Sequence, residues 1–314
     1  MKLVSIPANP VPDHVVSGSI KTPDGVNLRF ARWEPPPGRK GTVVILQGRA
    51  EFIEKYIETA RDLRARGFAV AAFDWRGQGL SDRALGDRHK GYVRSFAEYA
   101  TDLDAVMAQV VLPDCPPPIY GLAHSMGAAI AIRALHDGTR SFERVVLSAP
   151  MIALPHGALT RVAGPLARVM RLLGSGSAYV PAGDQSHSGR QDFLGNVLTS
   201  DPVRFARNAA VLEQAPEIGL GSPTVAWADA AMRVMNEFAQ PGYPGGIRQP
   251  ILMVAAGRDA IVSTPAIENF GMNLLAGRHL ILAGSQHEIL QEQDQYRNQF
   301  WAAFDAFVPG TPLY

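Results

Sequence analysis

The chain lacks the features of a disulfide-stabilised or nucleic-acid-binding protein. Its only cysteine is Cys115, which excludes an internal disulfide bond. It carries 30 Lys and Arg against 29 Asp and Glu, a net charge of +1, with no long run of like charge. Such a balance leaves no basic surplus, so nucleic acid is not expected as a partner.

Long apolar segments are also missing. No stretch approaches the ~20 apolar residues of a membrane span. Residues 1–14 contain proline and polar residues where a signal peptide would need an apolar stretch, so we expect a cytoplasmic protein. The histidines His89, His136, His156 and His187 lack the spacing of metal ligands, and we expect neither a metal nor a cofactor.

Apolar runs alternate along the chain with segments of helical periodicity, which is typical of a mostly parallel, doubly wound α/β sheet. With 314 residues, 46% of them hydrophobic, the chain can build one large core and an insertion. The predicted strands cover residues 15–22, 26–33, 42–46, 68–73, 119–122, 145–148, 251–255 and 280–282. The predicted helices cover residues 54–66, 96–111, 159–173 and 288–307.

About a hundred residues separate the strand that ends near Ser148 from the strand that begins at Ile251, whereas a typical connection has ~2–6 residues. This segment mixes apolar helical pieces with joints rich in Gly, Ser and Pro. We expect residues 1–150 and 247–314 to form the core, and residues 151–246 to form a helical lid over the site.

Ser125 lies between an apolar run and a helical pattern of small residues, in Ala123-His124-Ser125-Met126-Gly127. A strand that turns sharply into a helix holds such a serine in a strained conformation with its hydroxyl above the sheet edge. The turn tolerates only small residues two places before and after the serine, and Ala123 and Gly127 meet that need. We predict that Ser125 is a nucleophile, whereas by itself it could also be a helix cap.

A serine nucleophile needs a base and an acid that orients the base. Asp259 directly follows the predicted strand 251–255, and His287 follows the strand 280–282. All three residues therefore lie at the carboxyl edge of the sheet, in the chain order Ser, Asp, His. We predict a catalytic triad of Ser125, His287 and Asp259, although Asp259 and His287 singly could be turn or cap residues.

The tetrahedral oxyanion needs aimed hydrogen-bond donors. One is expected to be the backbone N–H of Met126, the residue after the nucleophile. The other is expected in the loop after the strand 42–46, where Gly48 lets the backbone approach the substrate and the Arg49 N–H donates. The alternative for this loop is an ordinary tight turn.

Taken together, these motifs resemble the α/β-hydrolase superfamily, in particular its monoacylglycerol lipase and lysophospholipase branch, the serine aminopeptidase-like hydrolases. The resemblance is carried by residues 47–51 with Tyr56, 73–81, 123–127, 257–259 and 287–288. Family members usually have His at the position of Gln47. The resemblance implies hydrolysis of acylglycerol or lysophospholipid esters, without a cofactor, under an apolar lid.

We therefore expect a serine ester hydrolase for a small-molecule acyl ester, in which lid residues such as Leu166 and Met170 line an acyl pocket. The alternatives are a small-acyl esterase, an amidase or peptidase with the same triad, or a catalytically silent binding module of the same fold. Arg161, Arg168 and Arg171 alternate with apolar residues and suggest transient contact of the lid with a membrane surface, or simply a solvated helix face. The sequence gives no oligomeric state.

Overall fold

An eight-stranded sheet forms the centre of the protein in a computed structural model, which describes residues 2–35, 37, 40–155, 157–181, 183 and 192–308, without the side chains of residues 158–161. The strand order is β1-β2-β4-β3-β5-β6-β7-β8. The strands are β1 (Val15–Lys21), β2 (Asn27–Trp33), β3 (Thr42–Leu46), β4 (Ala69–Phe73), β5 (Ile119–His124), β6 (Arg144–Ser148), β7 (Ile251–Ala256) and β8 (Gly277–Leu282).

Only the first part of the sheet is antiparallel. Strand β1 pairs antiparallel with β2, and β2 pairs antiparallel with β4. From β4 to β8 every neighbouring pair is parallel. The predicted mostly parallel α/β sheet is confirmed. Because parallel strands share their carboxyl edge, the residues that follow β3, β5, β7 and β8 meet on one side of the molecule.

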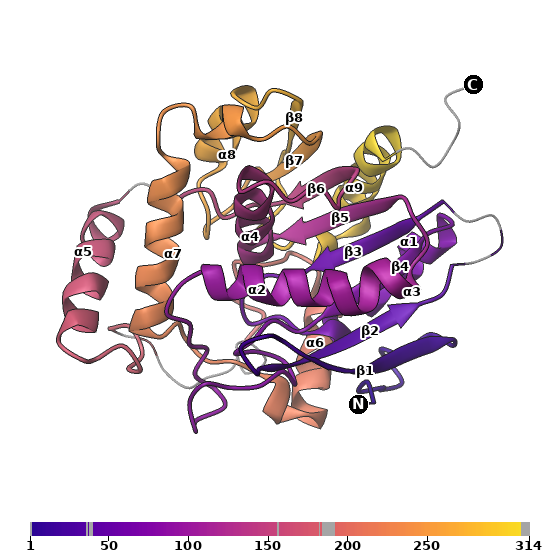
Figure 1. Cartoon of the computed structure of the whole chain (residues 1–314), viewed down its shortest axis with the longest axis horizontal. Coiled ribbons are helices and arrows are strands. Elements are labelled where there is room, and N and C mark those ends of the chain that lie inside the picture. The colour runs from indigo at the N-terminus through magenta and orange to yellow at the C-terminus, as the bar shows by residue number, and fades with distance from the viewer. Residues whose placement is uncertain are drawn as a thin grey trace.

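Helices cover both faces of this sheet. Helices α2 (Ala97–Val106) and α4 (Ser125–His136) lie on the near face in Figure 1, and α1 (Ile57–Ala65) and α9 (Asp294–Phe307) lie on the far face. The short α3 (Leu112–Asp114) precedes β5, and α8 (Thr264–Met272) connects β7 to β8. The sheet is thus buried on both sides, which explains why β3, β4, β5 and β7 are continuous apolar or small-residue runs.

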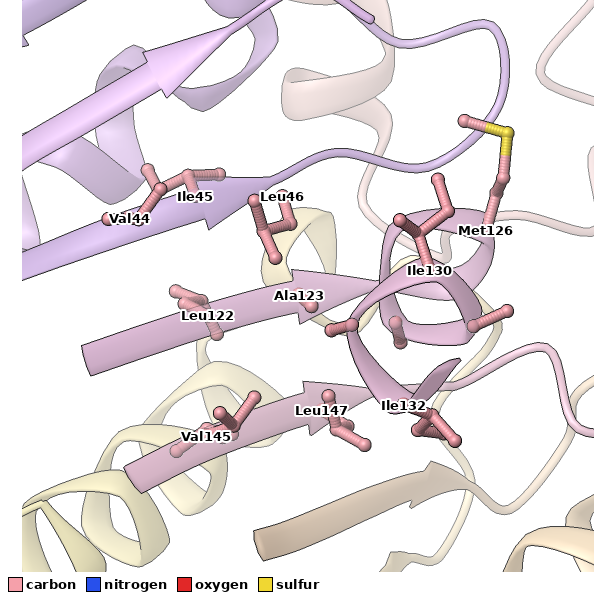
Figure 2. Packing of buried hydrophobic residues seen from close by; sticks show 14 of the residues in the cluster. Val44, Ile45, Leu46, Leu122, Ala123, Met126, Ile130, Ile132, Val145 and Leu147 are labelled. Carbon is pink, nitrogen blue, oxygen red and sulfur yellow. The ribbon is translucent and has the colours of Figure 1, made fainter. Parts of the chain in front are cut away.

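The core lies where the three central strands meet α4. Apolar side chains of β3, β5 and β6 pack against Ile130 and Ile132 of that helix, and all of them are almost fully buried (Figure 2). Helix α4 begins at Ser125, directly after β5. This packing therefore fixes the position of the residue predicted as the nucleophile.

In the described part of the segment between β6 and β7, three α-helices occur: α5 (Ala158–Leu172), α6 (Pro202–Gln214) and α7 (Val225–Phe238). Helices α5 and α7 lie side by side, away from the sheet (Figure 1). Helix α6 does not pack with this pair. Its residues Val211 and Leu212 are buried against Phe52, in an apolar cluster that is separate from the main core. Its start is fixed by Asp201, whose side chain accepts hydrogen bonds from the backbone N–H groups of Val203 and Arg204.

Two predicted helices are interrupted. The helix expected at residues 54–66 begins as a 3₁₀ turn, Ile53–Tyr56, before α1. The helix expected at residues 96–111 widens into a π turn at Met107–Val111 after α2. Short 3₁₀ turns also occur at Pro216–Ile218, Tyr243–Gly246 and Ile289–Gln291. Such local changes of helical pitch leave the hydrophobic periodicity nearly unchanged, so the sequence pattern cannot reveal them.

Candidate active site

Ser125 occupies the sharp turn between β5 and α4. Its φ angle is +49°, a left-handed conformation that is unfavourable for a residue with a side chain. The turn also explains the small residue at Gly127, because a Cβ atom there would collide with the carbonyl oxygens of Leu46 and Gln47. The backbone is therefore strained at the one serine that the sequence singled out.

Hydrogen bonds connect the three residues predicted as a triad. His287 Nε2 lies 3.0 Å from Ser125 Oγ, and His287 Nδ1 lies 2.8 Å from Asp259 Oδ2. The imidazole of His287 is buried, and the Asp259 side chain is fully buried. With the carboxylate accepting from Nδ1–H, Nε2 is left with its lone pair toward the serine hydroxyl.

The Asp259 carboxylate is held by its own loop as well as by His287. Its Oδ1 atom accepts hydrogen bonds from the backbone N–H groups of Ile261 (2.8 Å) and Val262 (2.9 Å). Burial alone would raise the pKa of this carboxyl, but the His287 hydrogen bond and charge and the two amides outweigh burial and lower the pKa. Asp259 is therefore ionised at neutral pH.

His124, next to the serine, lines the site without joining this chain of hydrogen bonds. Its ring centroid lies 4.9 Å from that of His287, and its Nδ1 atom lies 3.1 Å from the carbonyl oxygen of Ser148. Burial lowers the pKa of His124 despite the nearby Glu51 carboxylate. A neutral His124 thus packs against His287 without adding a positive charge to it.

The backbone amide of Arg49, in the loop after β3, is free within the described residues. The Gly48 N–H donates to Glu51 Oε2 (2.5 Å) and the Ala50 N–H donates to Gln78 Oε1 (3.3 Å), whereas the Arg49 N–H between them has no acceptor among the described residues. A Cβ atom at Gly48 would lie 2.8 Å from Glu51 Oε2 and 3.0 Å from His124 Cδ2, so a side chain there would displace the groups that surround the loop.

Met126 supplies a second free amide. As a residue of the first turn of α4, it has an N–H group that no intrahelical carbonyl can accept. Arg49, Gly48 and Met126 all line the same cavity as Ser125 and His287. The structure thus brings together the residues that the sequence predicted as nucleophile, base and oxyanion donors.

A buried ionic cluster, which the sequence motifs did not predict, supports this loop. Lys55 Nζ lies 3.0 Å from Glu51 Oε1 and 2.6 Å from Glu288 Oε1, and the Tyr56 hydroxyl donates to Glu51 Oε2 at 2.6 Å. Burial would raise the pKa of Glu51, but the charge of Lys55 and the hydrogen bond from Tyr56 lower it. The one sequence feature that could have indicated this cluster is that Glu51, Tyr56 and Glu288 all belong to the motifs that carry the family resemblance.

The cavity above Ser125 has a volume of about 970 Å³ and is lined mainly by apolar side chains. Helix α5 contributes Val162, Leu166 and Met170 to its wall, and α7 contributes Trp227 and Met235. Leu166 and Met170, which the sequence placed at an acyl pocket, therefore line the cavity. A space of this size and character fits a small, largely apolar ligand.

Some other apolar residues of the predicted helix 159–173 do not line the cavity. Val169 and Leu173 are exposed and are absent from the cavity wall, and the side chain of Leu159 lies outside the described residues. Arg171 is half-buried and paired with Asp229 of α7 at 2.5 Å, so it is not a free cation on the outer face.

Gln47 is fully buried, and neither amide atom of its side chain has a hydrogen-bond partner among the described residues. Its backbone carbonyl accepts from Trp75 Nε1 at 3.0 Å. Gln47 therefore holds the loop through its backbone carbonyl rather than through its side chain.

No group of three or more His, Cys, Asp or Glu that could hold a metal occurs in the part of the chain that the structure describes. His156 and His187 lie outside that part. Among the described helices, none is both long and apolar enough to cross a membrane.

Comparison with known proteins agrees with this geometry. The family model described as serine aminopeptidase, S33, matches residues 37–294. Lysophospholipase L2 of Escherichia coli (strain K12) is 33% identical over 285 residues, which cover 88% of this chain and 82% of that protein. Human monoglyceride lipase is 28% identical over 203 residues, which cover 63% of this chain and 62% of the lipase.

Solved structures show the same fold. A soluble variant of monoglyceride lipase from Saccharomyces cerevisiae, in complex with a substrate analogue, superposes with a TM-score of 0.73 at 17% identity, covering 98% of this chain and 99% of the lipase chain. The monoacylglycerol lipase of Paleococcus ferrophilus superposes with a TM-score of 0.69 at 20% identity, covering 90% of this chain and 99% of that chain. The resemblance inferred from the motifs is confirmed, and the chain belongs to the serine aminopeptidase S33 family of α/β-hydrolases.

Proposed function

We propose that the protein is a serine hydrolase that cleaves carboxylic esters of lipids with one acyl chain, namely monoacylglycerols or lysophospholipids, through an acyl-enzyme intermediate. The observation that carries the proposal is the hydrogen-bonded chain of Ser125, His287 and Asp259, which opens into a largely apolar cavity. The similarity to lysophospholipase L2 and to monoglyceride lipases supports a lipid ester as the substrate.

In this mechanism Ser125 Oγ attacks the ester carbonyl carbon while His287 Nε2 takes the hydroxyl proton. His287 then gives that proton to the leaving alcohol, which departs and leaves an acyl group on Ser125. A water molecule, deprotonated by His287, attacks the acyl carbon, and the fatty acid is released as Ser125 is regenerated. Asp259 holds the imidazole in the correct tautomer and stabilises its protonated form.

The backbone N–H groups of Arg49 and Met126 stabilise the oxyanion in both steps. Both residues line the cavity, and neither backbone amide has an acceptor on the described part of the chain or within α4. Removing one such donor typically costs ~10²–10³ in turnover. Gly48 serves this role indirectly, because it allows the loop to approach the site.

Residues 151–246 form the lid in this proposal, and residues 1–150 and 247–314 form the core. Leu166 and Met170 on α5 contact the acyl chain. The outer face of the same helix exposes Leu172, Leu173 and Arg168, and this combination supports transient contact with a membrane surface. The cytoplasmic location stays a prediction, which fractionation of cells that express the tagged protein would test.

An aminopeptidase with the same triad is the second candidate, because the family is described by that activity. Such an enzyme needs a carboxylate for the free amino group of its substrate. Glu51 and Glu288 are the carboxylates that line the cavity within the described residues, and both are already paired with Lys55. The cavity therefore favours an uncharged acyl chain over a peptide amine.

The test combines active-site labelling with a substrate screen. A fluorophosphonate probe should label the wild-type protein and not Ser125→Ala, which would exclude a silent binding module. Purified protein should then be assayed on 1-lauroylglycerol, a lauroyl lysophospholipid, p-nitrophenyl acetate and laurate, and aminoacyl amides. Turnover of the lauroyl lipids supports the proposal, whereas a preference for acetyl esters or aminoacyl amides would contradict it.

A further inference from the structure

Arg49 places a cationic side chain in the wall of the apolar cavity. Its Nη2 atom donates to the carbonyl oxygen of Gly221 at 2.6 Å, and its guanidinium carbon lies 5.2 Å from the centroid of the Trp227 ring. Its Nε–H has no acceptor among the described residues. One backbone carbonyl and one aromatic ring thus account for only part of the hydrogen-bonding capacity of the guanidinium.

No carboxylate of the described residues forms an ion pair with Arg49. The other cation in the cavity wall, Lys55, lies between Glu51 and Glu288 at 3.0 and 2.6 Å, so its charge is compensated. Burial lowers the pKa of Arg49 to about 10, which still leaves the guanidinium charged at neutral pH. A desolvated charge without a counter-ion costs free energy, and an anionic ligand would offset this cost.

We propose that the Arg49 side chain binds the phosphodiester of a lysophospholipid and makes the protein favour lysophospholipids over monoacylglycerols with the same acyl chain. This inference rests on the proposed function. A guanidinium binds phosphate oxygens in a bidentate manner and tolerates burial better than an ammonium group does. The phosphate of a lysophospholipid is a few bonds from the scissile ester, and the Arg49 side chain starts at the backbone proposed to bind the oxyanion of that ester.

Two other roles are consistent with the same contacts and are separated by the experiment. Arg49 could serve only to tie the loop to the lid through Gly221 and Trp227. The anion that binds Arg49 could also be the carboxylate of the released fatty acid, which accepts the same charge-assisted hydrogen bonds as a phosphate does.

The experiment measures kcat/KM for 1-lauroyl-lysophosphatidylglycerol and for 1-lauroylglycerol, both below their critical micelle concentrations. Arg49→Gln keeps a side-chain donor for the Gly221 carbonyl and removes the charge, whereas Arg49→Lys keeps the charge. We expect the ratio of the two kcat/KM values to fall about tenfold or more in Arg49→Gln, as for the loss of a charge-assisted hydrogen bond. Arg49→Lys should retain a large part of the ratio.

A matched control removes the same charge elsewhere. Arg233→Gln alters an exposed arginine of α7 outside the cavity wall, and the ratio should stay at the wild-type value if the effect of Arg49 is local. The ratio is used because any disturbance of the oxyanion loop lowers both kcat/KM values together.

Three results would overturn the inference. If Arg49→Gln lowered kcat/KM equally for both substrates, the Arg49 side chain would serve only to hold the loop against the lid. An unchanged ratio together with weaker product inhibition by laurate would assign the fatty-acid carboxylate as the anion. If the wild-type protein cleaves neither lipid, the proposed function is wrong, and the inference is wrong with it. If the protein cleaves both lipids and the ratio of the two kcat/KM values is unchanged in Arg49→Gln, only the proposed role of Arg49 is wrong.

Discussion

Lys55 Nζ lies 2.6 Å from Glu288 Oε1, and this contact joins the segment behind the Arg49 loop to the residue next to His287. Lys55 also lies 3.0 Å from Glu51, whose carboxylate accepts the Gly48 N–H. One buried ammonium group thus connects the loop of the proposed oxyanion donor with the loop of the proposed base. The relative position of the two loops depends on this ion cluster, although none of its side chains takes part in the proposed bond-breaking steps.

We therefore expect Lys55→Met to be both less stable and less active than the wild-type protein. The substitution leaves Glu51 and Glu288 buried without their cation, which typically destabilises a protein by about 3–5 kcal/mol. Lys55→Arg keeps the charge and should recover part of the loss. Thermal unfolding and kcat on 1-lauroylglycerol measure the two effects, and a Lys55→Met variant with wild-type stability and kcat would show that the cluster is unimportant.

Ser125→Ala should abolish ester turnover and fluorophosphonate labelling while the protein remains folded. Asp259→Asn should lower kcat by about 10⁴-fold, because His287 would no longer be held in the correct tautomer. The double variant should be hardly worse than Ser125→Ala, since residues that act as a unit are not additive. Circular dichroism provides the control for folding. Near-native activity in a folded Ser125→Ala protein would refute the assignment of the nucleophile.

The activity should fall on the acid side of neutrality because a protonated His287 cannot accept the Ser125 proton. The pKa of Asp259 is lowered, so this carboxylate stays ionised throughout that pH range and does not cause the loss. A profile of kcat/KM against pH, recorded with a p-nitrophenyl ester, should show one ionisation on its acid limb. Activity that is independent of pH on this limb would argue against His287 as the base.

The lid can be tested with α5 residues inside and outside the cavity wall. Leu166→Asp and Met170→Asp place a charge in the cavity wall, whereas Val169→Asp places it on an exposed residue of the same helix that does not line the cavity. Each buried methylene contributes ~0.8 kcal/mol, so kcat/KM of the wild-type protein should rise up to about fourfold per carbon from acetyl to medium-chain esters. The two cavity variants should lose this dependence on chain length, and Val169→Asp should keep it. A flat wild-type profile would instead favour a small-acyl esterase.

The bounds of the buried strands could be predicted from the sequence, because buried strands appear as apolar runs. Strands β3, β4 and β7 coincide with apolar runs to within one residue at each end. The edge strand β8 begins at Gly277, three residues before the predicted start, because its residues are partly exposed and no apolar run marks them. Helix α6 was not predicted, although Asp201 followed by Pro202 is a usual start signal.

The proposed triad could be predicted because each member lies at or shortly after the carboxyl end of a strand, and parallel strands end at one edge. The contacts of the Arg49 side chain could not. They join Arg49 to Gly221 and Trp227, more than 170 residues away in the chain, and no local periodicity reports such a pairing. For the same reason, the sequence could not identify which face of α5 lines the cavity.

Glu58 of α1 provides a test of how α6 is held to the core. Arg204 and Arg207 of α6 reach its carboxylate at 2.7 and 2.6 Å, and Arg297 of α9 lies 3.4 Å away. Burial would raise the pKa of Glu58, but these arginines outweigh burial and lower the pKa from 4.5 to about 2. The stabilisation is therefore fully present above pH 4.5 and is lost as the pH falls toward 2.

We accordingly expect Glu58→Gln to lower the free energy of unfolding at pH 7 by on the order of 2 kcal/mol, less than the pKa shift alone would give because the pair is partly exposed. The difference from the wild-type protein should shrink as the pH falls below 4.5. Urea unfolding at pH 7, 5, 4 and 3 measures it, with the exposed Glu217→Gln as the control. If the difference were the same at every pH, the ion cluster would not be the origin of the stabilisation, because protonating Glu58 removes the same charge that the substitution removes.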